Sequence, residues 1–297
     1  MKLKAQRNNT EYSGFQSAGR NQQYTVSGRR SYSGPLFLRR PPAMRLMILA
    51  ILVVLISGCI SVHNPISGKT EYYMFDDKAE IAWGDDAAKQ IKAQKKMVTD
   101  PTLTEPLQKM GEEIAAKSHR NYLQYHFYII DDAAINACAL PGGHIFVNSG
   151  LLEKLDEDQV AFVLAHEIGH VNARHGLKRI EAQMGFNLLA LGLAIGTKNQ
   201  GAVDLANQVY DLLSKGYSRE DEFLADSLGL QYAHNAGYDK TASLDVFDIF
   251  HREEKSSGAQ MVPVYLRTHP TPADRMNNAK AKIEELKVDG QIDFSKD

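Results

Sequence analysis

The chain has 297 residues, 43% of them hydrophobic and 24% charged, which is typical of a globular protein with a sizeable core. Its formal net charge is −2, but residues 1–43 contribute +7, because they hold eight basic residues and only one acid, so the remainder carries −9. A remainder this acidic lacks the basic groove of a nucleic-acid-binding protein, and that class is excluded.

Residues 1–43 differ from the rest in composition. They are rich in Ser, Gly, Asn, Gln and Arg and have no sustained apolar period, which predicts disorder. A basic arm for nucleic acid or membrane is one interpretation. We favour the other, an upstream extension of the open reading frame, because Met44 begins a well-formed signal peptide.

Residues 44–58 read as that signal peptide. Arg45 supplies a short positive region, and Leu46–Ile56 is apolar but too short to span a bilayer comfortably. The ending Leu-Ile-Ser-Gly-Cys59 resembles a bacterial lipobox. That resemblance implies lipid attachment at Cys59 and, with Ile60 following, an outer-membrane lipoprotein that faces the periplasm. The alternative is an uncleaved signal anchor.

Three short β-prone runs follow further along the chain. They are Tyr125–Ile130, Ile135–Leu140 and Ile145–Val147, and a Pro-Gly-Gly turn separates the last two. An exposed edge strand could pair with an extended substrate through main-chain hydrogen bonds, although an ordinary core hairpin would read the same way. The substrate-binding residues predicted on this strand are Asn136, Ala137, Cys138 and Ala139.

A helix is predicted after this hairpin. Asp156 offers an N-cap, Val160, Val163 and Leu164 recur at helical spacing, and Gly176 is a plausible C-terminal stop. A histidine near such a C-terminus, His175, is expected to complement the helix dipole.

The middle of this helix carries the motif His166-Glu167-Ile-Gly-His170. Residues four apart share a helix face, so both imidazoles can bind one metal ion, and neutral imidazoles suit Zn²⁺. Glu167 cannot join the same coordination without bending the helix, which leaves it free to act as a general base on a metal-activated water. A core helix with incidental histidines is the alternative.

A second helix is predicted from Ser218, with Asp221 at its third position as a variant capping box. Glu222 and Asp226 lie four residues apart on one face, as a ligand carboxylate and a carboxylate that orients a ligand histidine would. An acidic helix start can also be plain dipole complementarity. Before this helix, Phe186–Ile195 is apolar but too short for a membrane span. The shell is completed by a predicted loop at 196–201 and by helices near Ala202–Leu213 and Thr241–Glu254.

Four separated segments together resemble zinc metallopeptidase family forty-eight, which includes the heat-shock protease HtpX and the type-one CAAX prenyl endopeptidase. The two helices supply His166-Glu167-x-x-His170 and Glu222-x-x-Ala-Asp226, and the likeness spans roughly residues 75–280. The other two segments are Asn136–Leu151 and His269-Pro-Thr-Pro-Ala-Asp-Arg275.

The resemblance implies a role for each matching position. His166, His170 and Glu222 would bind one Zn²⁺, Glu167 would be the base, and Asp226 would hydrogen-bond to a ligand histidine. His269 and Arg275 would stabilise the tetrahedral oxyanion or bind substrate, since that task needs a donor opposite the attacking water. For His269 the alternative is a loop residue that Pro270 and Pro272 rigidify.

Residues 59–297 are therefore expected to form one α+β, mostly α, metallopeptidase domain of the gluzincin type, with an edge strand lining its cleft. The predicted activity is hydrolysis of unfolded or misassembled envelope proteins, with no nucleic-acid partner and an attachment to outer-membrane lipid through Cys59. The alternative function is a periplasmic assembly or holding factor whose zinc site is gated and conditionally active.

Overall fold

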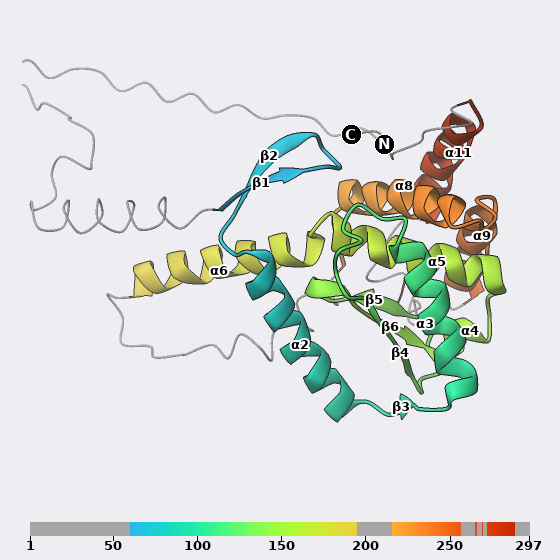
Figure 1. The fold of residues 1–297 in the computed structure, drawn as a ribbon, viewed down its shortest axis with the longest axis horizontal. Coiled ribbons are helices and arrows are strands. Elements are labelled where there is room, and N and C mark those ends of the chain that lie inside the picture. The colour runs from blue at the N-terminus through green and yellow to red at the C-terminus, as the bar shows by residue number, and fades with distance from the viewer. Residues whose placement is uncertain (1–59, 195–215, 257–264, 266–268, 270–271, 289–297) are drawn as a thin grey trace, which may run out of the picture. The chain divides into compact units, whose positions relative to one another are not determined.

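The structure is a computed structural model that describes residues 60–194, 216–256, 265, 269 and 272–288 (Figure 1). All of them belong to one compact unit, Leu55–Asp297. The predictions for residues 1–43, for the signal peptide, for Cys59, for the loop at 196–201 and for a helix near Ala202–Leu213 fall outside the described residues. Among the described helices, none combines the length and the apolar character needed to cross a bilayer.

The described chain is predominantly helical, with two small sheets, so the predicted α+β, mostly α class is confirmed. The strands are β1 (Ile60–Asn64), β2 (Lys69–Tyr73), β3 (Met97–Val98), β4 (His126–Ile130), β5 (Ala137–Ala139) and β6 (His144–Asn148). The helices are α2 (Asp77–Gln94), α3 (Pro101–Ala115), the 3-10 turn η2 (Pro141–Gly143), α4 (Ser149–Leu152), α5 (Glu157–Asn172), α6 (His175–Ala194), α8 (Arg219–Asn235), α9 (Ala242–Ser256) and α11 (Pro272–Val288).

The larger sheet has the strand order β3-β4-β6-β5, with β4 and β6 parallel and the other two pairs antiparallel. The predicted strand pair and its turn are thus present, and β5 lies at the edge. Gly142 and Gly143 form the turn at φ values of 78° and 102°, where residues with a Cβ are strained. A Cβ on Gly142 would also approach the Ile81 Cα to 2.7 Å, so α2 packs directly on this turn.

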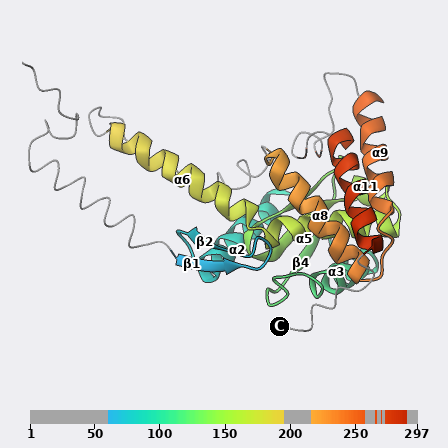
Figure 2. The same ribbon diagram turned by 90° about the horizontal axis from the view of Figure 1, so that it is seen from above.

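Helix α5 lies at the centre of the unit, in contact with α3, α8, α9 and β5 (Figures 1 and 2). Asp156 and Gln159 form a full capping box at its start, and each residue from Val160 to Asn172 is buried. A helix that is buried on all sides lies in the core, where burial of its apolar side chains away from water stabilises the fold. Two glycines let α8 approach α5 closely: a Cβ on Gly229 would lie 2.8 Å from the His166 backbone nitrogen, and one on Gly169 would lie 2.9 Å from the Ala225 carbonyl oxygen.

The predicted stop of this helix at Gly176 is wrong. Helix α5 ends at Asn172, Arg174 takes a left-handed φ of 56°, and α6 already begins at His175. A non-glycine residue holds such a conformation only where its surroundings enforce it. The Arg174 guanidinium does meet such partners, because it pairs with the Asp77 carboxylate and lies 3.7 Å from a Glu80 oxygen. These contacts with α2, distant in sequence, fix the break between the helices.

Candidate metal centre

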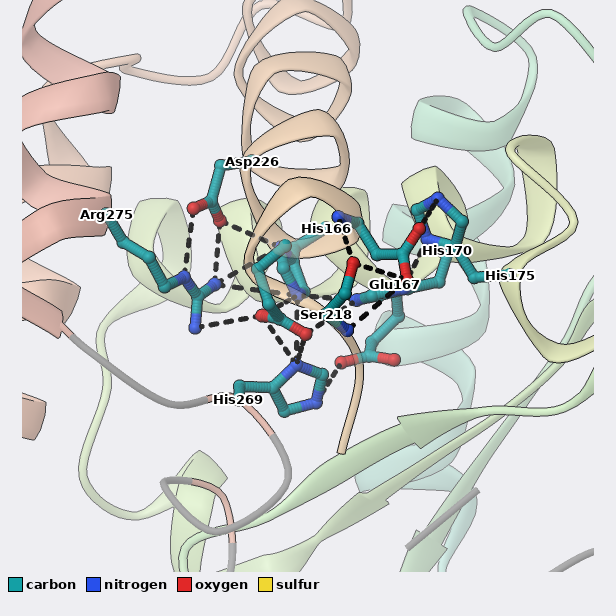
Figure 3. A network of polar contacts seen from close by, with 10 residues as sticks. His166, Glu167, His170, His175, Ser218, Asp226, His269 and Arg275 are labelled. Atoms are coloured by element: carbon teal, nitrogen blue, oxygen red, sulfur yellow. Dashed lines mark hydrogen bonds and ion pairs between the residues drawn. The ribbon is translucent and has the colours of Figure 1, made fainter. Parts of the chain in front are cut away.

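Four buried side chains converge between α5, α8 and the segment before α11 (Figure 3). They are His166 and His170 from α5, Glu222 from α8, and His269. None is more than 2% exposed, and one potential ligand atom from each lies within 4.8 Å of the others. The i, i+4 spacing places both α5 rings on one face, and the Ser218–Asp221 capping box starts α8 so that Glu222 faces them.

The spacing of the three predicted ligands fits a single metal ion. The Nε2 atoms of His166 and His170 are 3.0 Å apart, and they lie 3.7 and 3.6 Å from the Glu222 oxygens. Zinc–ligand bonds of about 2.0–2.2 Å in tetrahedral geometry put donors about 3.3–3.6 Å apart. The donor set therefore needs adjustments of only a few tenths of an ångström to close around an ion.

Protonation also suits a cation. Burial lowers the pKa of His170 well below its ordinary value, so the ring is neutral. Burial alone would raise the pKa of Glu222, but the charges of His269 and Arg275 outweigh it and hold that pKa below its usual range. His170 and Glu222 are thus in the forms that coordinate a cation, a neutral imidazole and a carboxylate anion.

Asp226 and Arg275 lie behind His166. The Asp226 Oδ1 atom is 2.9 Å from His166 Nδ1, which keeps the proton on Nδ1 and leaves Nε2 free to coordinate. Arg275 donates from Nε and Nη2 to the Asp226 carboxylate at 2.9 and 2.7 Å, and its Nη1 lies 3.3 Å from Glu222. Although burial would raise it, the pKa of Asp226 falls to about 2 because of the Arg275 charge.

Glu167 differs from the other carboxylates of the site. Its side chain is 1% exposed, and neither oxygen has a hydrogen-bond partner among the described residues. Burial raises its pKa, although the charges of His269 and His166 oppose that rise. A buried carboxylate without a hydrogen bond is costly to the fold, so its presence here indicates a chemical use.

His269 lies inside the ligand cluster. Its Nδ1 is 2.9 Å from both Glu222 oxygens and 3.4 Å from His166 Nε2, and its Nε2 is 3.7 Å from Glu167. The ring stacks on Tyr265 with centroids 4.4 Å apart. Contacts this close favour a direct part in the site over that of a loop residue.

The predicted substrate strand borders this cluster. Its residues Asn136, Ala137, Cys138 and Ala139 include all of β5, and within the described residues no strand pairs with the outer side of β5. Strand β5 packs against α5, the helix that carries Glu167, and burial together with the Glu167 charge raises the pKa of Cys138 to about 12. The Asn136 Oδ1 atom is buried and, among the described residues, has no partner.

Two contacts of the site were missed by sequence reasoning. His175 does not complement a helix C-terminus: it begins α6, and its Nδ1 lies 2.8 Å from Nδ1 of His170. The Tyr217 ring stacks on His170 with centroids 4.2 Å apart. Spacing alone could not reveal His175, because position i+5 on a continuous helix points about 140° away from i.

Residues 101–283 match a family described as Peptidase family M48. That match spans more than half of the chain and contains the whole cluster. The chain belongs to Peptidase family M48. The four motifs predicted membership of this metallopeptidase family, and that prediction is confirmed.

Named relatives agree with this assignment. A beta-barrel assembly-enhancing protease of Yersinia pestis is 29% identical over 220 residues, covering 70% of this chain and 44% of that protein. The mitochondrial metalloendopeptidase OMA1 of Schizosaccharomyces pombe is 27% identical, covering 77% of this chain and 67% of its own length. The predicted enzyme class, a metalloendopeptidase, is confirmed. The chain spans less than half the length of the bacterial relatives it matches.

Proposed function

We propose that this protein is a zinc endopeptidase that cuts unfolded or misassembled proteins of the bacterial envelope. One observation carries the proposal: nitrogen and oxygen atoms of His166, His170 and Glu222 converge at 3.0–3.7 Å beside the buried carboxylate of Glu167, which has no hydrogen bond among the described residues. A purely structural metal site needs no base at this position.

The donor set suits Zn²⁺ best. Two imidazoles and one carboxylate, with a further position available, are the usual ligands of a catalytic zinc ion. When bound, such an ion supplies a Lewis acid that polarises the substrate carbonyl and makes water more acidic. A carboxylate-rich, oxygen-only set would favour Mg²⁺ or Ca²⁺ instead.

The residues around the ion divide the remaining work. Glu167 takes a proton from the attacking water and delivers it to the leaving amine, and its raised pKa makes both transfers feasible. Asp226 fixes the His166 tautomer, and Arg275 compensates the charges of Asp226 and Glu222. His269, whose Nε2 lies 3.7 Å from Glu167, would donate to the developing oxyanion.

Substrate would be held by the outer edge of β5. Residues Asn136–Ala139 offer main-chain groups that bond to an extended peptide regardless of its side chains. A folded protein keeps most of its extended segments paired within its own sheets, so an edge-strand site favours unfolded or misassembled chains.

The position of His269 also supports a second candidate function. Its Nδ1 atom lies within 3.4 Å of two predicted ligands, as a fourth protein ligand would. A site closed in that way would be active only when His269 leaves the metal. The protein could then act chiefly as an assembly or holding factor.

The proposed location is the periplasmic face of the outer membrane, through a lipid on Cys59. The lipobox-like sequence supports it, as do bacterial relatives named for β-barrel assembly. A Cys59→Ser variant should leave the membrane fraction or accumulate as a precursor, because lipid chains provide the attachment. Mass spectrometry that found a mature, unlipidated N-terminus elsewhere would contradict this location.

The substrate proposal is tested with one protein in two states. The zinc-loaded full chain is incubated with a β-barrel protein, either unfolded or assembled in detergent, and the cleavage products are compared. We expect cuts in the unfolded form only. Equal cleavage of both forms would contradict selection of unfolded chains by the edge strand. If neither form were cleaved, the proposal that envelope proteins are the substrates would be rejected.

A further inference from the structure

The second ligand histidine has a partner on its far side that lies outside the four segments named above. His170 Nδ1 lies 2.8 Å from Nδ1 of His175 (Figure 3). The Nε2 atom of His175 lies 3.3 Å from the Asp221 Oδ1 atom. Both histidine side chains are at least 98% buried. Two ring nitrogens at this distance share one proton, so one of them donates and the other accepts.

The positions of the protons follow from the donor chemistry. If His170 is to coordinate an ion through Nε2, its neutral ring must carry the proton on Nδ1. The His175 Nδ1 atom then accepts that proton's hydrogen bond, and a neutral His175 must hold its own proton on Nε2. That proton points at the Asp221 carboxylate. Each proton in the row His170–His175–Asp221 therefore has a defined acceptor.

The backbone break after α5 makes this row possible. On a continuous helix the ring of residue 175 would point away from that of residue 170. The left-handed Arg174 interrupts the helix, and its guanidinium is held by Asp77 and Glu80 of α2. The break thus returns the first side chain of α6 to the metal-facing end of α5.

Asp221 also ties this row to the start of α8. Its Oδ2 atom accepts from the Ser218 hydroxyl at 2.9 Å and from the Ser218 backbone N–H at 3.3 Å, which completes the capping box. The next residue is the ligand Glu222, and Tyr217 stacks on the His170 ring. One helix start therefore fixes the Glu222 carboxylate and the orientation of the His170 ring together.

We infer that His175 is a positioning residue that holds His170 in its Nδ1-protonated tautomer, and that Asp221 holds His175 in turn. His166 has a different arrangement, since Asp226 contacts its Nδ1 directly. The two ligand rings are thus oriented by separate devices, one a carboxylate and the other a neutral imidazole backed by a carboxylate. Removing such a partner typically weakens metal affinity by about 10–100-fold.

This inference rests on the proposed metal site, and the test separates the two. The full chain and its variants are titrated with Co²⁺ against a competing chelator. His175→Phe keeps a ring but removes the acceptor, so Co²⁺ should bind about 10–100-fold more weakly. His175→Asn places an oxygen near the former Nδ1 and should recover most of the affinity.

Asp156→Ala is the matched control, because it removes the cap of α5 without touching the row. It should lower the melting temperature and leave Co²⁺ affinity unchanged. The inference is overturned if His175→Phe binds like the parent, if it loses no more than Asp156→Ala, or if His175→Asn is as weak as His175→Phe. A parent chain that binds no Co²⁺ would instead reject the metal site itself.

A measurement on the unmutated protein covers the case in which His175→Phe does not fold. Ring-nitrogen NMR of the metal-free parent should find protons on Nδ1 of His170 and Nε2 of His175. A His170 proton on Nε2 would overturn the inference.

Discussion

Replacing Gly229 by alanine should disturb the metal centre through the packing of α8 against α5. The new Cβ would lie 2.8 Å from the His166 backbone nitrogen and 2.9 Å from its Cα, where ordinary contacts begin near 3.4 Å. Helices α5 and α8 must then separate by about 0.5 Å, and overpacking of this kind costs about 1–3 kcal/mol, partly offset by the roughly 1 kcal/mol that alanine gains over glycine in a helix.

The larger effect should be on metal affinity. Helix α5 carries two predicted ligands and α8 the third, and metal sites tolerate deviations of only about 0.2 Å. We expect Co²⁺ binding, measured by chelator competition, to weaken at least about tenfold, the range seen when ligands lose their support. Gly237→Ala is the control, because it strains a φ of 98° just after α8 but meets no atom within 4 Å. Gly237→Ala should lower the stability of the fold and leave the Co²⁺ affinity unchanged. If Gly229→Ala bound Co²⁺ like the parent, the proposed link between helix packing and donor spacing would be refuted.

Three further substitutions test separate parts of the account. Asp226→Asn should weaken Co²⁺ binding by about 10–100-fold, since a neutral amide orients the ligand ring poorly, and unchanged affinity would remove Asp226 from that task. His269→Ala should lower kcat by about 10²-fold if the ring donates to the oxyanion, and should raise kcat if the ring closes the site. If neither kcat nor KM changed, His269 would have only a structural role. Arg120→Met should cost about 3–5 kcal/mol in urea unfolding, because Arg120 meets Glu80 at 2.8 Å where both are buried, whereas Lys109→Met at an exposed pair should change little. A small loss in Arg120→Met would contradict the buried pair.

Local features of the fold were predictable because they depend on neighbours in sequence. The capping boxes at Asp156 and Ser218, and the turn at Pro141–Gly143, follow from side chains within three residues of one another. The two ligand histidines follow from helical spacing in the same way. These elements appear in the structure within one or two residues of the predicted positions.

Features that depend on distant contacts were not predictable in this way. The end of α5 was placed four residues too late, because Arg174 is held by Asp77, 97 residues earlier in the chain. The contact of His175 with His170 follows from that break. The pairing of Arg275 with Asp226 joins α11 to α8 across 49 residues, and only the family resemblance, not spacing, indicated that Arg275 lies near the site.

The central claim is that Glu167 is the base of a metallopeptidase site whose ligands are other residues. Glu167→Gln should therefore keep about one equivalent of zinc while casein hydrolysis falls by about 10²–10⁴-fold, the usual contribution of a general base. Glu157→Gln, at the first position of the same helix, should match the parent in both. Hydrolysis at the parent rate by zinc-loaded Glu167→Gln would contradict the account.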